Sequence, residues 1–218
     1  MTVSTMLSLL AQGFVTSLLI FCLTLLGSLP LGLAVMLARR SRFAPLRGFI
    51  KAYISIMRGT PLMLQLMVVF YGPKLLLGVT VPGNWRFTAV IVAFVINYAA
   101  YFAEIYRGGI ESIPRGQYEA AQVLGYTKAQ TFFRILLPQM VKRVIPAVTN
   151  EVITLVKDTS LASVIGTVEM FTRAKQIVAS PNTPGMLALV AAGVFYYVFN
   201  YLVAFLMEQS EKALAYYR

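Results

Sequence analysis

Three ionisable residues interrupt one long apolar stretch in the second half of the chain. Glu151, Lys157 and Asp158 lie among valine, isoleucine and leucine residues between positions 144 and 168. An ionised side chain at the centre of a membrane helix costs roughly 2.5–3.5 kcal/mol, so it is retained for a function or for pairing. Carboxylates bind an ammonium group and a lysine binds a carboxylate, and an amino acid carries both groups. The stretch is therefore a candidate binding site for a zwitterion.

Helical spacing places these charges together with polar neighbours on one side of a helix. Glu151, Thr154 and Asp158 stand at i, i+3 and i+7, which is one face of an α-helix. An earlier apolar stretch carries a similar stripe, in which Asn97 and Tyr101 stand at i and i+4. We expect the two stripes to face each other and to bind the substrate through Asn97, Tyr101, Glu151, Thr154, Lys157 and Asp158.

Structural explanations of these charges stay open at this stage. Lys157 and Asp158 could neutralise charges on a neighbouring helix or on a partner subunit. Glu104, which extends the first stripe, could pair with Arg107 three residues later. Glu151 has no basic residue three or four positions away. An unpaired acid there favours a substrate with a cationic side chain, such as arginine, lysine or histidine.

The composition indicates that a membrane surrounds these residues. Of the 218 residues, 58% are hydrophobic and 12% are charged, against about 25% charged in ordinary soluble domains. This excludes a soluble globular protein and a disordered chain. The sequence contains no histidine and a single cysteine, Cys22. These counts exclude imidazole chemistry, an internal disulfide and a thiolate metal cluster.

Apolar stretches of about 20 residues predict an all-α protein with about five transmembrane helices. The second span starts with Thr60 as N-cap and Pro61 in the first turn. The fourth is the least regular, because each of its apolar halves is too short to cross alone. A single crossing satisfies the charge distribution described next, and two short re-entrant segments are the alternative. The spans are Leu18–Leu37, Thr60–Leu77, Phe87–Tyr106, Val144–Val168 and a last helix that begins after Pro184 and reaches Met207.

The basic residues predict the orientation of these spans. Six follow the first span, six follow the third and two lie in the C-terminal tail, whereas four lie in the other loops. The positive-inside rule then places the N-terminus outside and the C-terminus in the cytoplasm. Most of the formal charge of +11 is therefore an orientation signal. We expect the lipid membrane as a partner and no nucleic acid.

The cytoplasmic segment between the third and fourth spans, residues 107–143, is longer than a connection requires. It predicts a short helix that Gly125 ends in the left-handed conformation. Thr127 and Gln130 form a capping-box pattern, which opens a second helix toward Pro138. Such an element is suited to docking on a partner protein. An ordinary amphipathic helix on the inner leaflet is the alternative.

The same segment carries the motif by which the chain resembles a known family. Glu119-Ala120-Ala121, then Gly125 and Ile-x-Leu-Pro at positions 135–138, are similar to the EAA loop of ATP-binding-cassette (ABC) importer permeases. The segments 58–61, 97–110 and 157–166 resemble the subfamily that takes up polar amino acids. The resemblance implies that this loop forms a coupling helix, whose contacts to an ATPase subunit are Glu119, Ala120, Ala121 and Gly125.

The resemblance further implies that residues 1–218 form a single permease domain of a type I importer in a bacterial plasma membrane. Its partners would be two ABC ATPase subunits, a second permease subunit, identical or related, and an extracytoplasmic amino acid-binding protein. The sequence has no G-x-x-x-x-G-K-[ST] motif. We therefore expect no enzymatic activity and no cofactor or metal in this chain, with ATP and Mg²⁺ on the ATPase partners. The alternatives are a subunit of an ion-gradient-driven secondary transporter and a multi-pass membrane enzyme.

Overall fold

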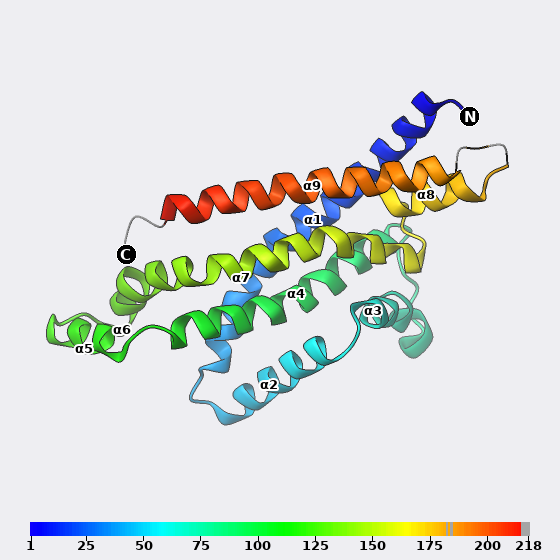
Figure 1. Ribbon diagram of the computed structural model, residues 1–218. Coiled ribbons are helices and arrows are strands. Elements are labelled where there is room, and N and C mark those ends of the chain that lie inside the picture. Colours follow the sequence, from blue (N-terminus) through cyan, green and yellow to red (C-terminus); the bar gives the residue numbers. More distant parts are fainter. Residues whose placement is uncertain (182, 184, 215–218) are drawn as a thin grey trace.

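The computed structural model describes residues 1–181, 183 and 185–214, and every regular element within these ranges is a helix. The predicted all-α fold is therefore confirmed. The longest helices are α1 (Val3–Arg39), α4 (Trp85–Glu111) and α9 (Gly185–Leu214). In Figure 1 the short helix α5 lies at one end of the molecule, whereas α8 and the N-terminus lie at the opposite end. We refer to these as the α5 end and the α8 end.

Helix α4 is the centre of the packing, since it contacts α1, α2, α3 and α7. Phe94 and Phe102 of α4 are fully buried. Gly32 of α1 approaches α4 so closely that a Cβ atom there would stand 2.8 Å from the Cβ of Phe102. Small residues are favoured at such contacts because membrane helices associate by close packing rather than by the hydrophobic effect. Helix α4 is thus the scaffold that positions polar side chains from its neighbours.

Helices α2 (Ala44–Gly59) and α3 (Leu62–Leu77) meet at a bend of 111°. The prediction that Thr60 caps the second span was wrong. Pro61 is the N-cap of α3, and the Thr60 hydroxyl donates instead to the carbonyl of Ile56 in α2. Proline explains the break, because it has no backbone N–H and disfavours the helical conformation of the residue before it. The predicted second span is therefore only the second half of a bent helix pair.

The first part of the segment 107–143 folds as predicted. Helix α5 (Arg115–Val123) is followed by Gly125, whose φ is 74°. The backbone N–H of Gly125 donates to Gln122 at 3.0 Å, which satisfies a carbonyl at the end of the helix. Thr127 then forms both hydrogen bonds of a capping box with Gln130 at the start of the next helix.

The second helix of this segment runs toward Pro138 as predicted and then continues past it. Helix α6 (Lys128–Gln130) runs through a π-helical turn, η1 (Thr131–Leu136), directly into α7 (Leu137–Asp158). The π-helical turn leaves Pro138 in the first turn of α7, where a missing N–H is tolerated. The second part of the segment 107–143 and the start of the fourth predicted span therefore form one continuous helix.

The prediction of one helix from Val144 to Val168 was also wrong, because α7 ends at Asp158. A 3₁₀ segment, η2 (Thr159–Ile165), follows, and Gly166 ends it with φ 75°. The Thr159 hydroxyl donates to the carbonyl of Val156 at 2.8 Å. Such local bonds compete with the helical hydrogen-bond ladder. The charges predicted near the middle of a span therefore lie where the helix changes type.

Helix α8 (Met170–Ala179) packs against α1 and α9 at the α8 end. Its N-cap is Glu169, a fully buried residue that the sequence reasoning did not single out. The carboxylate accepts from the backbone N–H groups of Phe171 at 2.6 Å and Thr172 at 2.7 Å. It also accepts from the Thr172 hydroxyl at 2.9 Å and from the Tyr196 hydroxyl of α9 at 3.3 Å. One carboxylate thus links the start of α8 to α9.

Three of the described helices, α1, α4 and α9, are long and apolar enough to cross a membrane, and the bent pair α2–α3 would add a fourth. Helix α9 begins at Gly185, directly after Pro184 as predicted, although Pro184 itself lies outside the described residues. Helix α7 is not among these apolar helices, so the five crossings stay a prediction. The external position of the N-terminus also stays a prediction.

Candidate substrate and coupling sites

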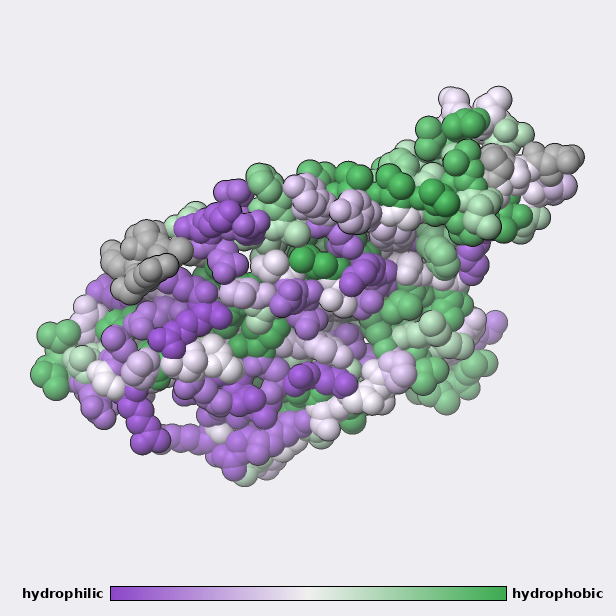
Figure 2. Space-filling view, viewed as in Figure 1, coloured by the Kyte–Doolittle hydropathy of each residue, from purple (hydrophilic) through white to green (hydrophobic). Residues whose placement is uncertain are grey.

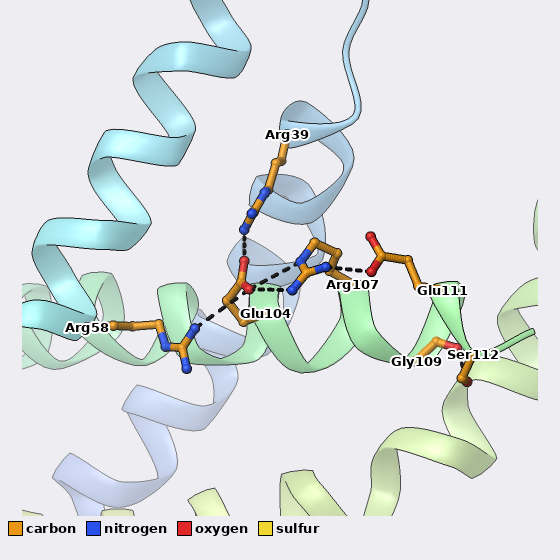
Figure 3. A network of polar contacts seen from close by, with 7 residues as sticks. All are labelled: Arg39, Arg58, Glu104, Arg107, Gly109, Glu111 and Ser112. Carbon is orange, nitrogen blue, oxygen red and sulfur yellow. Dashed lines mark hydrogen bonds and ion pairs between the residues drawn. The ribbon is translucent and has the colours of Figure 1, made fainter.

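A cluster of charged residues joins three helices toward the α5 end (Figure 3). Glu104 of α4, 14% exposed, pairs with Arg39 at the end of α1, with Arg107 at 2.9 Å and with Arg58 of α2 at 3.6 Å. Arg107 also pairs with Glu111 at 2.5 Å. The predicted pair of Glu104 and Arg107 is therefore confirmed, and arginines of α1 and α2 complete it. Only the tertiary fold brings Arg39 and Arg58 to this carboxylate.

The predicted substrate residue Asn97 is buried against the bend between α2 and α3. Its side-chain amide donates to the carbonyl of Met57 at 3.0 Å and to the Gln65 side chain at 2.9 Å. The Gln65 amide in turn donates to the same Met57 carbonyl and to Thr60. These bonds satisfy backbone carbonyls that the break at Pro61 leaves without helical partners. Sequence reasoning missed Gln65, although it is an isolated polar residue within an apolar run.

Tyr101, the second member of the α4 stripe, also faces α2. Its ring lies beneath the guanidinium of Arg58, with 5.4 Å from the guanidinium carbon to the ring centroid. This is the geometry of a cation–π contact. Tyr101 and Arg58 line a cleft of about 520 Å³ together with Glu104 and residues of α1 and α2.

Asp158 at the end of α7 accepts a hydrogen bond of 2.7 Å from the hydroxyl of Tyr98 in α4. This bond connects α4 to α7, and Tyr98 was not among the predicted site residues. Lys157 is exposed, and the Thr154 hydroxyl donates to the carbonyl of Asn150 in its own helix at 2.9 Å. The neighbours Lys157 and Asp158 therefore have different surroundings.

The two polar stripes do not simply face each other across one gap. Asn97 and Tyr101 contact α2 and the bend before α3, whereas the neighbouring Tyr98 contacts α7. Glu151 is half-buried and makes no hydrogen bond or ion pair to another described residue. A half-buried carboxylate without such a partner retains its capacity to bind a cationic group. The substrate role of the six predicted residues stays a prediction.

The predicted coupling residues lie on α5 and the turn after it. Glu119, Ala120 and Gly125 are exposed, whereas Ala121 is fully buried. Ala121 therefore packs α5 against the rest of the chain and does not lie on its free surface. Val123, 89% exposed, and Leu124 add an apolar tip. In Figure 2 this tip is hydrophobic, next to a largely hydrophilic surface. An exposed apolar tip of this kind suits a protein partner.

Helix α5 is attached to α7, and so is the end of α4 that precedes it. The side-chain amide of Gln139 in α7 donates to the side-chain oxygen of Gln117 in α5 at 3.3 Å. Arg143 of α7 donates to the carbonyl and the hydroxyl of Ser112, which ends α4, and the latter bond is 3.1 Å long. One turn earlier, Gly109 leaves no room for a Cβ beside Val144 and Met140. A displacement of α5 would therefore act on both α4 and α7.

Comparison with known proteins gives consistent matches over nearly the whole chain. The family described as binding-protein-dependent transport system inner membrane component matches residues 28–216. The arginine transport system permease protein ArtQ of Bacillus subtilis is 38% identical over 204 residues, which are 93% of this chain and 91% of that protein. A putative glutamine transport system permease protein GlnP of Rickettsia bellii is 31% identical over 205 residues, 94% of this chain and 92% of that protein.

Solved structures agree with these matches. A crystal structure of an amino acid ABC transporter with histidines aligns with a TM-score of 0.86 and 30% identity, covering 98% of this chain and 100% of that one. The MetNI methionine ABC transporter shares the fold, with a TM-score of 0.74 and 19% identity over 99% of this chain and 100% of that one. The resemblance seen in the EAA motif is thus confirmed: this integral membrane protein belongs to the family of binding-protein-dependent transport system inner membrane components.

Proposed function

We propose that the chain is the permease subunit of a bacterial ABC importer that carries amino acids, with a preference for basic ones, across the inner membrane. The observation that carries this proposal is the complete EAA element, which folds as an exposed helix with a left-handed glycine turn and a capped second helix. The relatives named for arginine and glutamine transport, and the solved transporter with histidines, support an amino acid as the substrate.

In this proposal the α5 end faces the cytoplasm and meets an ATPase subunit. Glu119, Ala120 and Gly125 are exposed and available for this contact, and the tip at Val123 adds apolar surface. ATP and Mg²⁺ belong to two separate ATPase subunits, because this sequence has no phosphate-cradling loop. The chain itself is not an enzyme. A second permease subunit and an extracytoplasmic binding protein at the α8 end complete the transporter.

The substrate contacts follow from the carboxylates on α7. Glu151 is half-buried and unpaired within the described part of the chain, so it is available to a cationic side chain. Asp158 lies about two turns further along the same face of α7 and accepts a hydrogen bond of 2.7 Å from the Tyr98 hydroxyl. Arginine transport by a relative that is 38% identical is consistent with this charge pattern.

The first experiment reconstitutes the chain into liposomes with its candidate ATPase and binding protein and measures uptake of labelled arginine. We expect uptake to require ATP on the α5 side. It should persist in the presence of ionophores. Uptake that follows an ion gradient without ATP would identify a secondary transporter and overturn the proposal.

The second experiment tests the assigned residues within that system. Glu151→Gln should lower arginine uptake at least tenfold, while Glu208→Gln, which removes an exposed acid paired with Lys212, should leave uptake unchanged. Ala120→Arg should abolish co-purification of the ATPase, because it places a charged side chain on the exposed face of α5. Unchanged arginine uptake by Glu151→Gln would refute the preference for basic substrates but not the importer assignment.

A further inference from the structure

The cleft beside Glu104 has an excess of positive charge that the proposed transport role does not use. It has a volume of about 520 Å³ and lies between α1, α2 and α4. Arg39, Lys51 and Arg58 line it from two helices, with Glu104 as its acidic residue. Lys51 is exposed and forms no ion pair with another described residue.

The residues that line the cleft carry an excess of about two positive charges, since Arg39, Lys51 and Arg58 stand against Glu104. One carboxylate, Glu104, forms ion pairs with three arginines, and among the described residues Arg107 forms a second ion pair, with Glu111. Figure 3 shows the three arginines around Glu104, with Glu111 beside Arg107. Lys51, which also lines the cleft, adds a fourth basic side chain to these two acidic ones. Like charges gathered around a shared carboxylate repel one another. An anion that enters the cleft would relieve this repulsion.

The outer side of α2 is suited to lipid. Phe49, 70% exposed, and Ile56, 56% exposed, project from the helix that supplies Lys51 and Arg58. Ile50 and Ile54, on a neighbouring side of the helix, are buried against the rest of the chain. Helix α2 thus presents apolar side chains to its surroundings on one face and basic side chains to the cleft on the opposite face, as expected for a helix that lies beside lipid.

We propose that this cleft binds the phosphate headgroup of an anionic lipid from the cytoplasmic leaflet. Basic clefts between transmembrane helices on the cytoplasmic side are a known means of binding such headgroups. The headgroup lies against Lys51, Arg39 and Arg58. The bound lipid stabilises the junction of α1, α2 and α4. This role concerns the membrane, so it is separate from the identity of the transported amino acid.

The test is thermal unfolding of the purified full-length chain in neutral detergent with added lipid. Phosphatidylglycerol should raise the melting temperature by about 2–4 °C more than phosphatidylcholine, the shift that a moderate excess of ligand produces in a chain of this size. Lys51→Gln should remove at least half of this difference. Lys212→Gln, which removes another exposed lysine, should respond like the wild type.

Several outcomes would overturn the inference. Equal shifts with the two lipids would show that the headgroup charge is not recognised, and an unchanged shift in Lys51→Gln would place the lipid elsewhere. Inorganic phosphate that reproduces the full shift without lipid would identify a free anion as the ligand. A full shift with arginine alone would assign the cleft to the substrate carboxylate. The inference would be supported if the wild type retained phosphatidylglycerol through purification and Lys51→Gln retained less.

Discussion

Two glutamates hold helices together at opposite ends of this protein by different means. Glu104 toward the α5 end is surrounded by arginines from α1, α2 and α4, whereas Glu169 at the α8 end accepts hydrogen bonds from backbone N–H and hydroxyl groups. Glu104 is still 14% exposed, and Glu169 is fully buried. The described residues provide no ion pair to Glu169.

The difference follows from what each end of the molecule offers to a carboxylate. Basic residues gather at the α5 end, where the positive-inside rule predicts cytoplasm. At the α8 end, the free N–H groups of the first turn of α8 supply the donors instead. Hydrogen bonds to a buried carboxylate are screened by salt much less than partly exposed ion pairs are. We therefore expect a rigid α8 end and an electrostatically adjustable α5 end.

The largest effect is expected from Glu169→Ala. The substitution leaves two backbone N–H groups and two hydroxyls without their acceptor, at a cost of about 3 kcal/mol in unfolding free energy. Thermal unfolding in detergent should show a fall of about 6–12 °C. Glu169→Gln keeps one acceptor oxygen and should lose about half as much. A loss below 1 °C for Glu169→Ala would mean that the α8 end does not depend on this residue.

Gly13→Ala should have the next largest effect and tests the same end without changing a charge. A Cβ at Gly13 would stand 2.7 Å from the Cα and 2.9 Å from the backbone nitrogen of Met170. Backbone atoms cannot move aside as a flexible side chain can, so we expect a loss of about 2 kcal/mol. The matched control is Gly193→Ala in α9, where nothing lies within 4 Å and alanine favours the helix. Equal melting temperatures for the two variants would contradict the close approach of α1 to α8.

Glu104→Gln should be less damaging and should depend on salt. It leaves three arginines facing a neutral amide, for which we expect a loss of about 1–2 kcal/mol at low ionic strength. The difference in melting temperature from the wild type should shrink as salt is raised from 50 mM to 500 mM, where the Debye length falls below about 10 Å. The corresponding difference for Glu169→Gln should stay constant. If both differences respond equally to salt, the contrast between the two ends is incorrect.

The smallest effect is expected from Arg58→Gln. This arginine is 44% exposed and lies 3.6 Å from Glu104, so the pair contributes no more than about 0.5 kcal/mol. The melting temperature should fall by less than about 2 °C. A fall as large as that of Glu104→Gln would show that Arg58 makes the main contribution to the stability of the cluster. The contact with the Tyr101 ring would then also contribute to stability.

Local sequence signals predicted those parts of the chain that depend on near neighbours. The capping box of Thr127 and Gln130 and the left-handed turn at Gly125 formed as expected, because their partners are three or four residues apart. The pairing of Glu104 with Arg107 belongs to the same class. Predictions that required knowledge of distant partners were weaker. Asn97, for example, contacts the carbonyl of Met57 and the side chain of Gln65 instead of the α7 stripe.

The ends of α7 also could not be predicted from the local sequence. The charge distribution favours a single crossing that contains the charged residues 157–158, but the helix changes to a 3₁₀ segment at Thr159. The hydroxyl bonds of Thr159 and Ser160 to nearby carbonyls favour that change, and packing of η2 against α3 accommodates it. Neither contact can be recognised from hydropathy.

The sequence by itself determined that this chain is an all-helical membrane protein with an EAA element, since apolar length, charge placement and capping residues are local properties. Only the tertiary structure decided which helices share Glu104, that Tyr98 holds Asp158, and that Glu169 is buried at the start of α8. Ion pairs and hydrogen bonds between helices depend on how the helices are rotated and staggered. That arrangement is set by close packing at residues such as Gly13 and Gly32, whose partners are far away in the sequence.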